Sequence, residues 1–179
     1  QGREVNRVLV LMPDSTAWIR WKLALRKPGE IAPACEQSVL KAGMDDLVIG
    51  LTRLQCDFDF GAESLLEEMG RVEGRHLVCG RGRYELLCLP SVTENVSSAL
   101  LPLLEEFLDA GGRVASASRL PRFVDGRPSD APERLAGKFP YQWTTTDTDL
   151  AGTVVSLVPP RLRVASASHA DLLFRRLET

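Results

Sequence analysis

The apolar positions of this chain fall into short runs separated by amphipathic stretches. Residues 5–13 (VNRVLVLMP) form a β-branched apolar run that ends at a proline, which is typical of a strand buried on both faces. Residues 83–90 (RYELLCLP) repeat this strand–proline pattern, and residues 113–118 (RVASAS) predict a further strand. We also expect a short strand over residues 57–60 and an edge strand over residues 76–79.

Helical periodicity appears between these runs. Ser38 is the expected N-cap of a helix that continues to about residue 55, with its apolar side chains on one face. A short helix is predicted over residues 62–69. The clearest pattern covers residues 98–110, where leucine and phenylalanine form one stripe and the pair Gly111-Gly112 ends the helix.

The remaining segments carry weaker signals. Residues 14–33 favour an extended loop with a short helix at most. Residues 121–140 contain four prolines and little periodicity, so we expect irregular structure there. Residues 147–158 favour a helix, and residues 162–167 and 172–178 alternate like strands. The order of strands and helices predicts an α/β fold with an open parallel sheet.

Composition and charge narrow the class of protein. Apolar residues at 44% and charged residues at 26% are ordinary for a globular domain, and 179 residues indicate a single one, spanning 1–179. The 22 Lys and Arg against 24 Asp and Glu give a net charge of −2, which argues against nucleic acid or an anionic membrane as partner. A barrel of eight βα units needs about 250 residues and is excluded.

No targeting or membrane segment is expected. The longest clean apolar run covers residues 8–12, far short of the roughly 20 residues that span a bilayer. The first 30 residues show no basic-then-apolar leader, which slightly favours a cytoplasmic location. A fragment of a larger protein would also lack a leader, so the compartment is unknown.

Cysteine and histidine are too few and too scattered for a metal site. The residues concerned are Cys35, Cys56, Cys79, Cys88, His76 and His169. No CxxC pair occurs, and we therefore expect no metal and interpret the cysteines as buried thiols, with one or two disulfides as the open alternative.

The sequence also lacks a recognisable catalytic turn. A nucleophile elbow needs a serine or cysteine on a glycine-flanked strand-to-helix turn, and no GxSxG or GxCxG motif is present. Ser116 and Ser118 end a suitable strand without such glycines. The turn at residues 80–82 (GRG) lacks the third glycine and the helix of a phosphate-binding loop. We predict no catalytic residue and no cofactor.

Two groups of residues are candidates for contact with a ligand or partner. Parallel sheets of this class bind ligands at the carboxyl ends of their strands. The residues expected to line that crevice are Asp14, Ser15, Ser91 and Ser118. Indole and phenol rings suit both stacking on sugar rings and burial against a partner domain. The aromatic candidates for carbohydrate or interdomain contact are Trp18, Trp21, Tyr141 and Trp143, with packing in the protein as the structural alternative.

Several short motifs, taken in order, resemble a known domain. The segment VLVLMPDSTAW (8–18) resembles the opening of the glutamine-amidotransferase-like domain of large bacterial glycoside hydrolases, the α-L-rhamnosidase-like enzymes, and more distantly the trimerisation domain of β-galactosidases. The further matching segments are CDFDFGAES (56–64), YELLCLP (84–90), FLDAGGRV (107–114), LPRFVDG (120–126) and LLFRRLE (172–178).

This resemblance implies a flavodoxin-like, mostly parallel sheet with helices on both faces, carried as an internal module of a multidomain enzyme. Residues 160–179 would then be linker strands toward the next domain. In such proteins the catalytic carboxylates lie on a separate barrel. Amidotransferases of this fold carry a cysteine after the strand equivalent to residues 113–118, where this chain has Ser116, Ala117 and Ser118. That departure argues against amidotransferase activity.

The resulting hypothesis is a noncatalytic structural module of a glycoside hydrolase, related to carbohydrate metabolism in bacteria. Its expected partners are other domains of the parent chain, with homo-oligomerisation and carbohydrate contact left open. Two alternatives remain: a divergent amidotransferase or serine hydrolase that uses Ser116 or Ser118, and a carbohydrate-binding module built on Trp18, Trp21 and Trp143.

Overall fold

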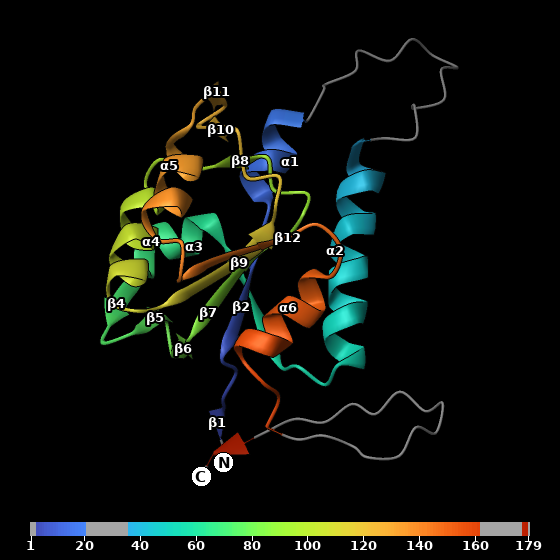
Figure 1. Ribbon diagram of the computed structural model, residues 1–179, viewed down its shortest axis with the longest axis vertical. Coiled ribbons are helices and arrows are strands. Elements are labelled where there is room, and N and C mark those ends of the chain that lie inside the picture. The colour runs from blue at the N-terminus through green and yellow to red at the C-terminus, as the bar shows by residue number, and fades with distance from the viewer. Residues whose placement is uncertain (1–2, 21–35, 162–176, 179) are drawn as a thin grey trace.

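A five-stranded parallel sheet forms the centre of the molecule (Figure 1). The computed structural model describes residues 3–20, 36–161 and 177–178 of the chain. The sheet order is β3-β2-β7-β9-β12, and all four neighbouring pairs run parallel. Its strands are β2 (Val8–Met12), β3 (Phe58–Ala62), β7 (Leu86–Leu89), β9 (Arg113–Ala117) and β12 (Trp143–Thr146). In chain order this is the 2-1-3-4-5 arrangement of flavodoxin-like folds, so the predicted fold class is confirmed.

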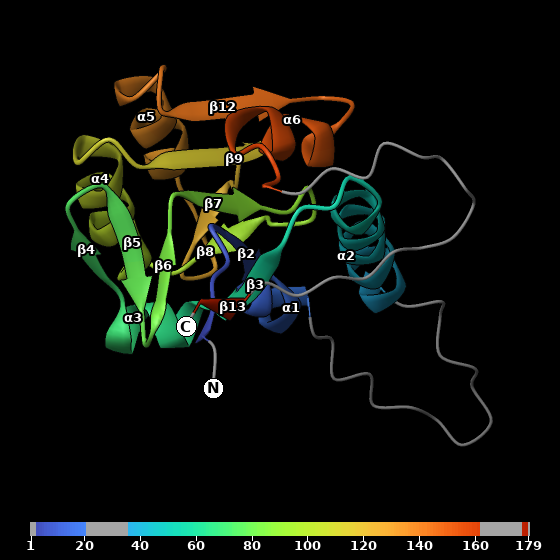
Figure 2. The ribbon, with the colours of Figure 1, turned by 90° about the horizontal axis from the view of Figure 1, so that it is seen from below.

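Helices cover both faces of the sheet because the strands are apolar on both sides (Figure 2). Successive strand residues point to opposite faces: Leu9 and Leu11 belong to one core cluster, whereas Val8 and Val10 belong to the other. The helices that close the first cluster are α3 (Glu63–Met69), α4 (Leu100–Asp109) and α5 (Ala131–Lys138). Those that close the second are α2 (Glu36–Arg53) and α6 (Leu150–Leu157).

Two small sheets, a short helix and a pair of short strands surround the central sheet and its helices. An antiparallel sheet contains β4 (Arg71–Glu73), β5 (His76–Cys79) and β6 (Gly82–Tyr84). A second small sheet contains β8 (Asn95–Val96), β10 (Phe123–Val124) and β11 (Arg127–Pro128). The short helix α1 (Asp14–Arg20) follows β2. Strands β1 (Arg3–Glu4) and β13 (Leu177–Glu178) pair antiparallel, which brings residues 3–4 and 177–178 together.

The apolar run at residues 83–90 forms two strands in different sheets, where one strand was expected. Tyr84 pairs with Leu77 in the antiparallel sheet, while Leu86 pairs with Val8 in the central sheet. The peptide nitrogens of Glu85 and Leu86 both donate to the Arg7 carbonyl, at 2.8 and 3.3 Å, where the chain passes from one sheet to the other. The expectation of an edge strand at 76–79 was also wrong, because β5 lies between β4 and β6.

The segment 121–140 is more regular than its prolines suggested. It contains β10, β11 and α5, and Pro132 lies in the first turn of α5, where no N–H partner is lost. The following residues form β12, the fifth strand of the central sheet, which the sequence pattern did not indicate. Its sequence WTTT has no apolar alternation, and its place is set by parallel pairing with β9.

Two predicted helix boundaries also change. Helix α2 begins at Glu36, so Ser38 lies inside the helix and is not its N-cap. Residues 14–20 form α1 directly after β2, within the segment 14–33 for which an extended loop with a short helix at most was predicted. The predicted strand at residues 162–167, and residues 172–176 of the last predicted strand, lie outside the described residues.

The glycines of α2 serve close packing. A Cβ at Gly50 would lie 2.8 Å from the Cβ of Ala151, and one at Gly43 would lie 2.4 Å from Cγ1 of Val92. These separations are shorter than van der Waals contact, so any larger side chain would push α2 away from α6 and from the loop after β7. Glycine lowers helix stability by roughly 1 kcal/mol at each position relative to alanine, and the close packing of α2 requires it there.

Candidate functional site

The candidate site is the carboxyl edge of the sheet near β2 and β7, where the direction of strand order reverses. Asp14 and Ser15 begin α1 directly after β2. Ser91 and Ser118 follow β7 and β9, and both are exposed. The Ser118 backbone N–H donates to the Thr146 carbonyl at 3.0 Å, which continues the ladder between β9 and β12. The structure therefore connects Ser15 to the site's interior and leaves Ser91 and Ser118 at its surface.

The centre of this edge is the carboxyl group of Glu63, the first residue of α3. Glu63 is 3% exposed. Its Oε1 accepts hydrogen bonds from the Ser15 hydroxyl at 2.5 Å and from the Ser15 backbone N–H at 3.3 Å. Its Oε2 accepts from the Ser97 backbone N–H at 2.8 Å. One buried carboxyl thus joins the segments that follow β3, β2 and β8.

A second set of contacts extends the network from α1 to the β10–β11 hairpin. Thr16 is fully buried, and its Oγ1 accepts from the backbone N–H groups of Glu94 and Asn95, each at 3.0 Å. The Asn95 side-chain oxygen accepts from the Gly126 N–H at 2.8 Å, and the Asp125 carboxylate accepts from the Ser98 N–H at 3.0 Å. These four backbone donors are therefore used within the protein.

The sequence did not single out Glu63, Thr16 or Asn95. For Glu63 a usable signal was present, because it is the first residue after a short strand and the carboxyl ends of parallel strands meet at one edge. Thr16 and Asn95 gave no comparable signal. Thr16 lies in a segment assigned to a loop, and Asn95 lies in a two-residue strand between β7 and α4.

Burial dominates the electrostatics of the two acidic groups at this edge. It raises the pKa of Glu63, and the hydrogen bonds from Ser15 and Ser97 oppose that rise in part. Burial also raises the pKa of Asp14. Burial thus makes the ionised form of Glu63 less stable, and the three hydrogen-bond donors offset part of that loss.

This shift predicts a pH dependence of stability. Because the folded-state pKa of Glu63 lies above its ordinary value of 4.5, the folded chain binds the proton more tightly than the unfolded chain. The stabilisation from that proton is complete below the unfolded pKa and is lost as pH rises through the folded pKa. We expect wild type to lose stability relative to Glu63→Gln as the pH rises above about 4.5, measured by urea unfolding at a series of pH values. Parallel pH profiles for the two proteins would contradict this expectation, and Glu67→Gln on the exposed side of α3 is the control.

No nucleophile elbow is present in residues 3–20 and 36–161. Apart from glycines, the residues with positive φ in this part are Gln55 and Asp125, neither of which follows a strand of the central sheet. Ser116 is buried, and its Oγ accepts from the Trp143 indole nitrogen at 2.9 Å. His76 lies on β5 opposite Glu73, and His169 lies outside the described residues.

The contact between Ser15 and Glu63 is the nearest approach to a nucleophile and its base. A hydroxyl at 2.5 Å from a carboxylate has the distance that such a pair requires. Acyl transfer also needs unoccupied N–H donors for the oxyanion. Here the N–H groups of Ser15 and Ser97 already donate to Glu63. The arrangement therefore links segments and offers no prepared oxyanion hole from these groups.

The aromatic candidates do not form one surface. Trp18 on α1 is 75% exposed and Tyr141 is 93% exposed, so both rings are available to a ligand or partner. Trp143 is 5% exposed and lies in the core with its indole N–H bonded to Ser116, which is the packing alternative left open by the sequence. Trp21 lies outside the described residues.

Two of the three thiols in the described ranges are buried. Cys56, Cys79 and Cys88 are free there, and burial raises the pKa of Cys56 to about 11. Burial also raises the pKa of Cys88, so both thiols are protonated at neutral pH. No group of three or more potential metal ligands occurs among the described residues. No helix in this part of the chain has the length and apolar character of a membrane span.

Comparison with known proteins gives limited matches. No protein-family model matches the chain, and no curated protein matches it. Among solved structures, a rhamnosidase from Novosphingobium sp. PP1Y matches with a TM-score of 0.47 and 15% sequence identity. The match covers 88% of this chain and 14% of the rhamnosidase.

Proposed function

We propose that this chain is a noncatalytic structural module of a larger glycoside-hydrolase-like protein, where it makes contacts between domains or subunits. The observation that carries the proposal is the Glu63 network. At the edge where flavodoxin-like sheets bind ligands, Ser15, Ser97 and Glu63 satisfy one another. The assignment to glycoside hydrolases rests on the sequence motifs described above, from residues 8–18 onward.

Exposed apolar side chains support a role in contacts. Edge strand β3 exposes Phe60, and the neighbouring helices α1 and α3 expose further apolar groups. The exposed residues on these three elements are Trp18, Ile19, Phe60, Leu65 and Met69. Because Glu63 joins the starts of α1 and α3, these elements are held in a fixed relation. Exposed apolar side chains on neighbouring elements are compatible with contact to another protein surface.

Activity assays on the purified chain test the proposal. The chain is incubated with glutamine, with an aryl rhamnoside and with an aryl galactoside, and release of ammonia or of the aryl alcohol is measured. We expect rates equal to those without protein, because the N–H groups of Ser15 and Ser97 beside the Ser15–Glu63 pair already donate to Glu63. A fluorophosphonate serine probe is likewise expected to leave the chain unlabelled.

Two results would contradict the structural role. Activity that disappears in Ser118→Ala or Ser15→Ala, but persists in the exposed-site control Ser64→Ala, would make the chain an enzyme. The exposed ring of Trp18 favours sugar binding as the second candidate. Tryptophan fluorescence that saturates with rhamnose or galactose in wild type, and not in Trp18→Phe, would establish that candidate instead.

A further inference from the structure

Strand β3 forms one edge of the central sheet, and β12 forms the other (Figure 2). An edge strand presents backbone N–H and C=O groups that can bind a further extended strand unless the protein blocks them. At β12 the Gln142 and Thr146 carbonyls accept hydrogen bonds from the β9 segment, so the Trp143 backbone groups point outward. The outward Trp143 N–H is already used, because it donates to the Phe139 carbonyl at 2.9 Å. The β12 edge is therefore blocked in part by the chain itself.

At β3 the register identifies which backbone groups point away from the sheet. Residues of a parallel strand bond alternately to the neighbours on either side. The Arg7 carbonyl accepts from the Leu86 N–H of β7 at 3.3 Å, so the even-numbered residues of β2 face β3. The residues of β3 that stand opposite them direct their own N–H and C=O groups outward, and these residues are Phe58, Phe60 and Ala62. Within the described ranges, the outward N–H groups of Phe60 and Ala62 have no partner.

Strand β3 lacks the features that usually block a sheet edge. Its sequence FDFGA contains no lysine or proline, and its pairing with β2 runs over all five residues without a bulge. The charged side chain of this strand, Asp59, accepts hydrogen bonds from the Asn6 amide at 2.6 Å and from the Tyr84 hydroxyl at 2.9 Å. Because both carboxylate oxygens have donors within the chain, Asp59 does not keep another strand away from this edge.

An apolar strip accompanies the outward backbone groups. The Phe58 and Phe60 rings lie edge to face with their centroids 5.3 Å apart, and Phe60 is 50% exposed. The three outward residues are arranged symmetrically about Phe60. In an antiparallel pair of two β3 strands centred there, Phe60 would stand opposite Phe60, and Phe58 opposite Ala62. Asp59 would stand opposite Gly61, so no like charges on the two strands would face each other.

We propose that β3 pairs antiparallel with β3 of a second copy of this chain, so that two five-stranded sheets become one continuous sheet. Main-chain hydrogen bonds of Phe60 and Ala62, together with the contact between the two Phe60 rings, stabilise the pair. Both copies use the same surface, as the partners of a closed homodimer do. The pairing rests on the contact role proposed above, for which it names the surface and the partner.

Sedimentation velocity of the full chain at increasing concentrations, up to about 1 mM, tests the pairing. We expect wild type to pass from monomer to dimer within this range. Ala62→Pro removes an outward N–H, and the φ of −72° at Ala62 already suits proline. This variant should raise the dissociation constant about tenfold or more. Ala62→Ser is the matched control, because it keeps the N–H and should dimerise like wild type.

Two further measurements separate this edge from any other contact. Phe60→Lys places a charge on the edge and should weaken the dimer, whereas Tyr141→Lys, at an exposed position before β12, should not. Amide hydrogen exchange at Phe60 should slow as the protein concentration rises, while exchange at Thr145 of β12 should stay the same. Circular dichroism confirms that each variant folds.

Three results would overturn the pairing. They are a wild type that stays monomeric at about 1 mM, a dimer that persists unchanged in Ala62→Pro or Phe60→Lys, and exchange at Phe60 that does not slow in the dimer. Each of them leaves contacts with other domains of a parent chain as the role of the module. Activity in the assays described above would instead contradict the noncatalytic role, whatever the oligomeric state.

Discussion

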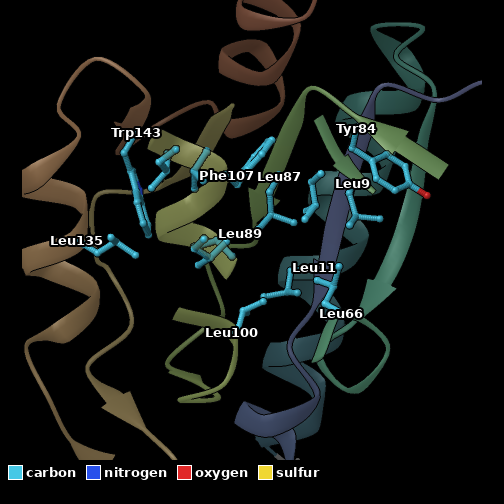
Figure 3. Close-up of a cluster of buried hydrophobic side chains, with 14 of the residues drawn as sticks. Leu9, Leu11, Leu66, Tyr84, Leu87, Leu89, Leu100, Phe107, Leu135 and Trp143 are labelled. Atoms are coloured by element: carbon cyan, nitrogen blue, oxygen red, sulfur yellow. The ribbon is translucent and has the colours of Figure 1, made fainter. Parts of the chain in front are cut away.

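Replacing Trp143 with alanine is expected to lower the free energy of unfolding by about 3–5 kcal/mol. The indole is 5% exposed and lies in the same core cluster as Phe107 and Leu135 (Figure 3). Its N–H donates to the Ser116 hydroxyl at 2.9 Å. The substitution would leave a cavity beside β12 and remove a buried hydrogen bond. Urea unfolding followed by far-ultraviolet circular dichroism measures the change.

Trp18→Ala is the matched control for this experiment. The same side chain is removed, but Trp18 is 75% exposed, so the stability should change by less than about 0.5 kcal/mol. A Trp143→Ala protein that is as stable as Trp18→Ala would show that the indole of Trp143 does not stabilise the core. A large loss at Trp18 would instead indicate that its ring is buried against another part of the chain or against a second copy.

The second large effect is expected at Glu63. Glu63→Ala should lower the free energy of unfolding by about 2–4 kcal/mol, because three donors lose their acceptor in a buried place. These donors are the Ser15 hydroxyl and the backbone N–H groups of Ser15 and Ser97. Denaturant unfolding at neutral pH measures the loss. The same experiment bears on function. It tests whether the contacts of Glu63 with Ser15 and Ser97 hold the carboxyl edge of the sheet together.

Glu67→Ala provides the comparison, because Glu67 lies on the same helix and is exposed. Its stability should remain within about 0.5 kcal/mol of wild type. Glu63→Ala of wild-type stability would mean that the network contributes little, and the crevice would then be open to a ligand. Stability retained together with binding of glutamine or a sugar would point to one of the enzyme or carbohydrate alternatives.

The sequence predicts only part of the candidate site. Asp14 and Ser15 were predicted to line a ligand crevice, and the structure has them at the start of α1, directly after β2. Glu63, the hydrogen-bond partner of Ser15, was not predicted, because it is 48 residues from Ser15 along the chain. Hydrogen bonds across such separations depend on which strands become neighbours, and that is decided by the assembled sheet.

The secondary structure likewise contains elements that the sequence predicts and elements that it does not. Strands β2 and β9 and helix α4 were predicted close to their observed bounds, because each contains an apolar pattern complete in itself. Strand β12 and helix α5 were missed, since their sequences WTTT and APERLAGK lack a strong local pattern. The division of residues 83–90 between β6 and β7 was not predicted either, because the segment RYELLCLP was interpreted as one strand that ends at its proline.

The sequence by itself determined the class of fold, since buried apolar strands alternating with amphipathic helices can be satisfied by a parallel sheet covered on both faces. It also determined the lack of a glycine-lined elbow at residues 116–118. The tertiary structure decided that Trp143 is a core residue and that Glu63 links three segments. These features depend on packing and hydrogen bonds between residues far apart in the sequence, which local periodicity does not encode.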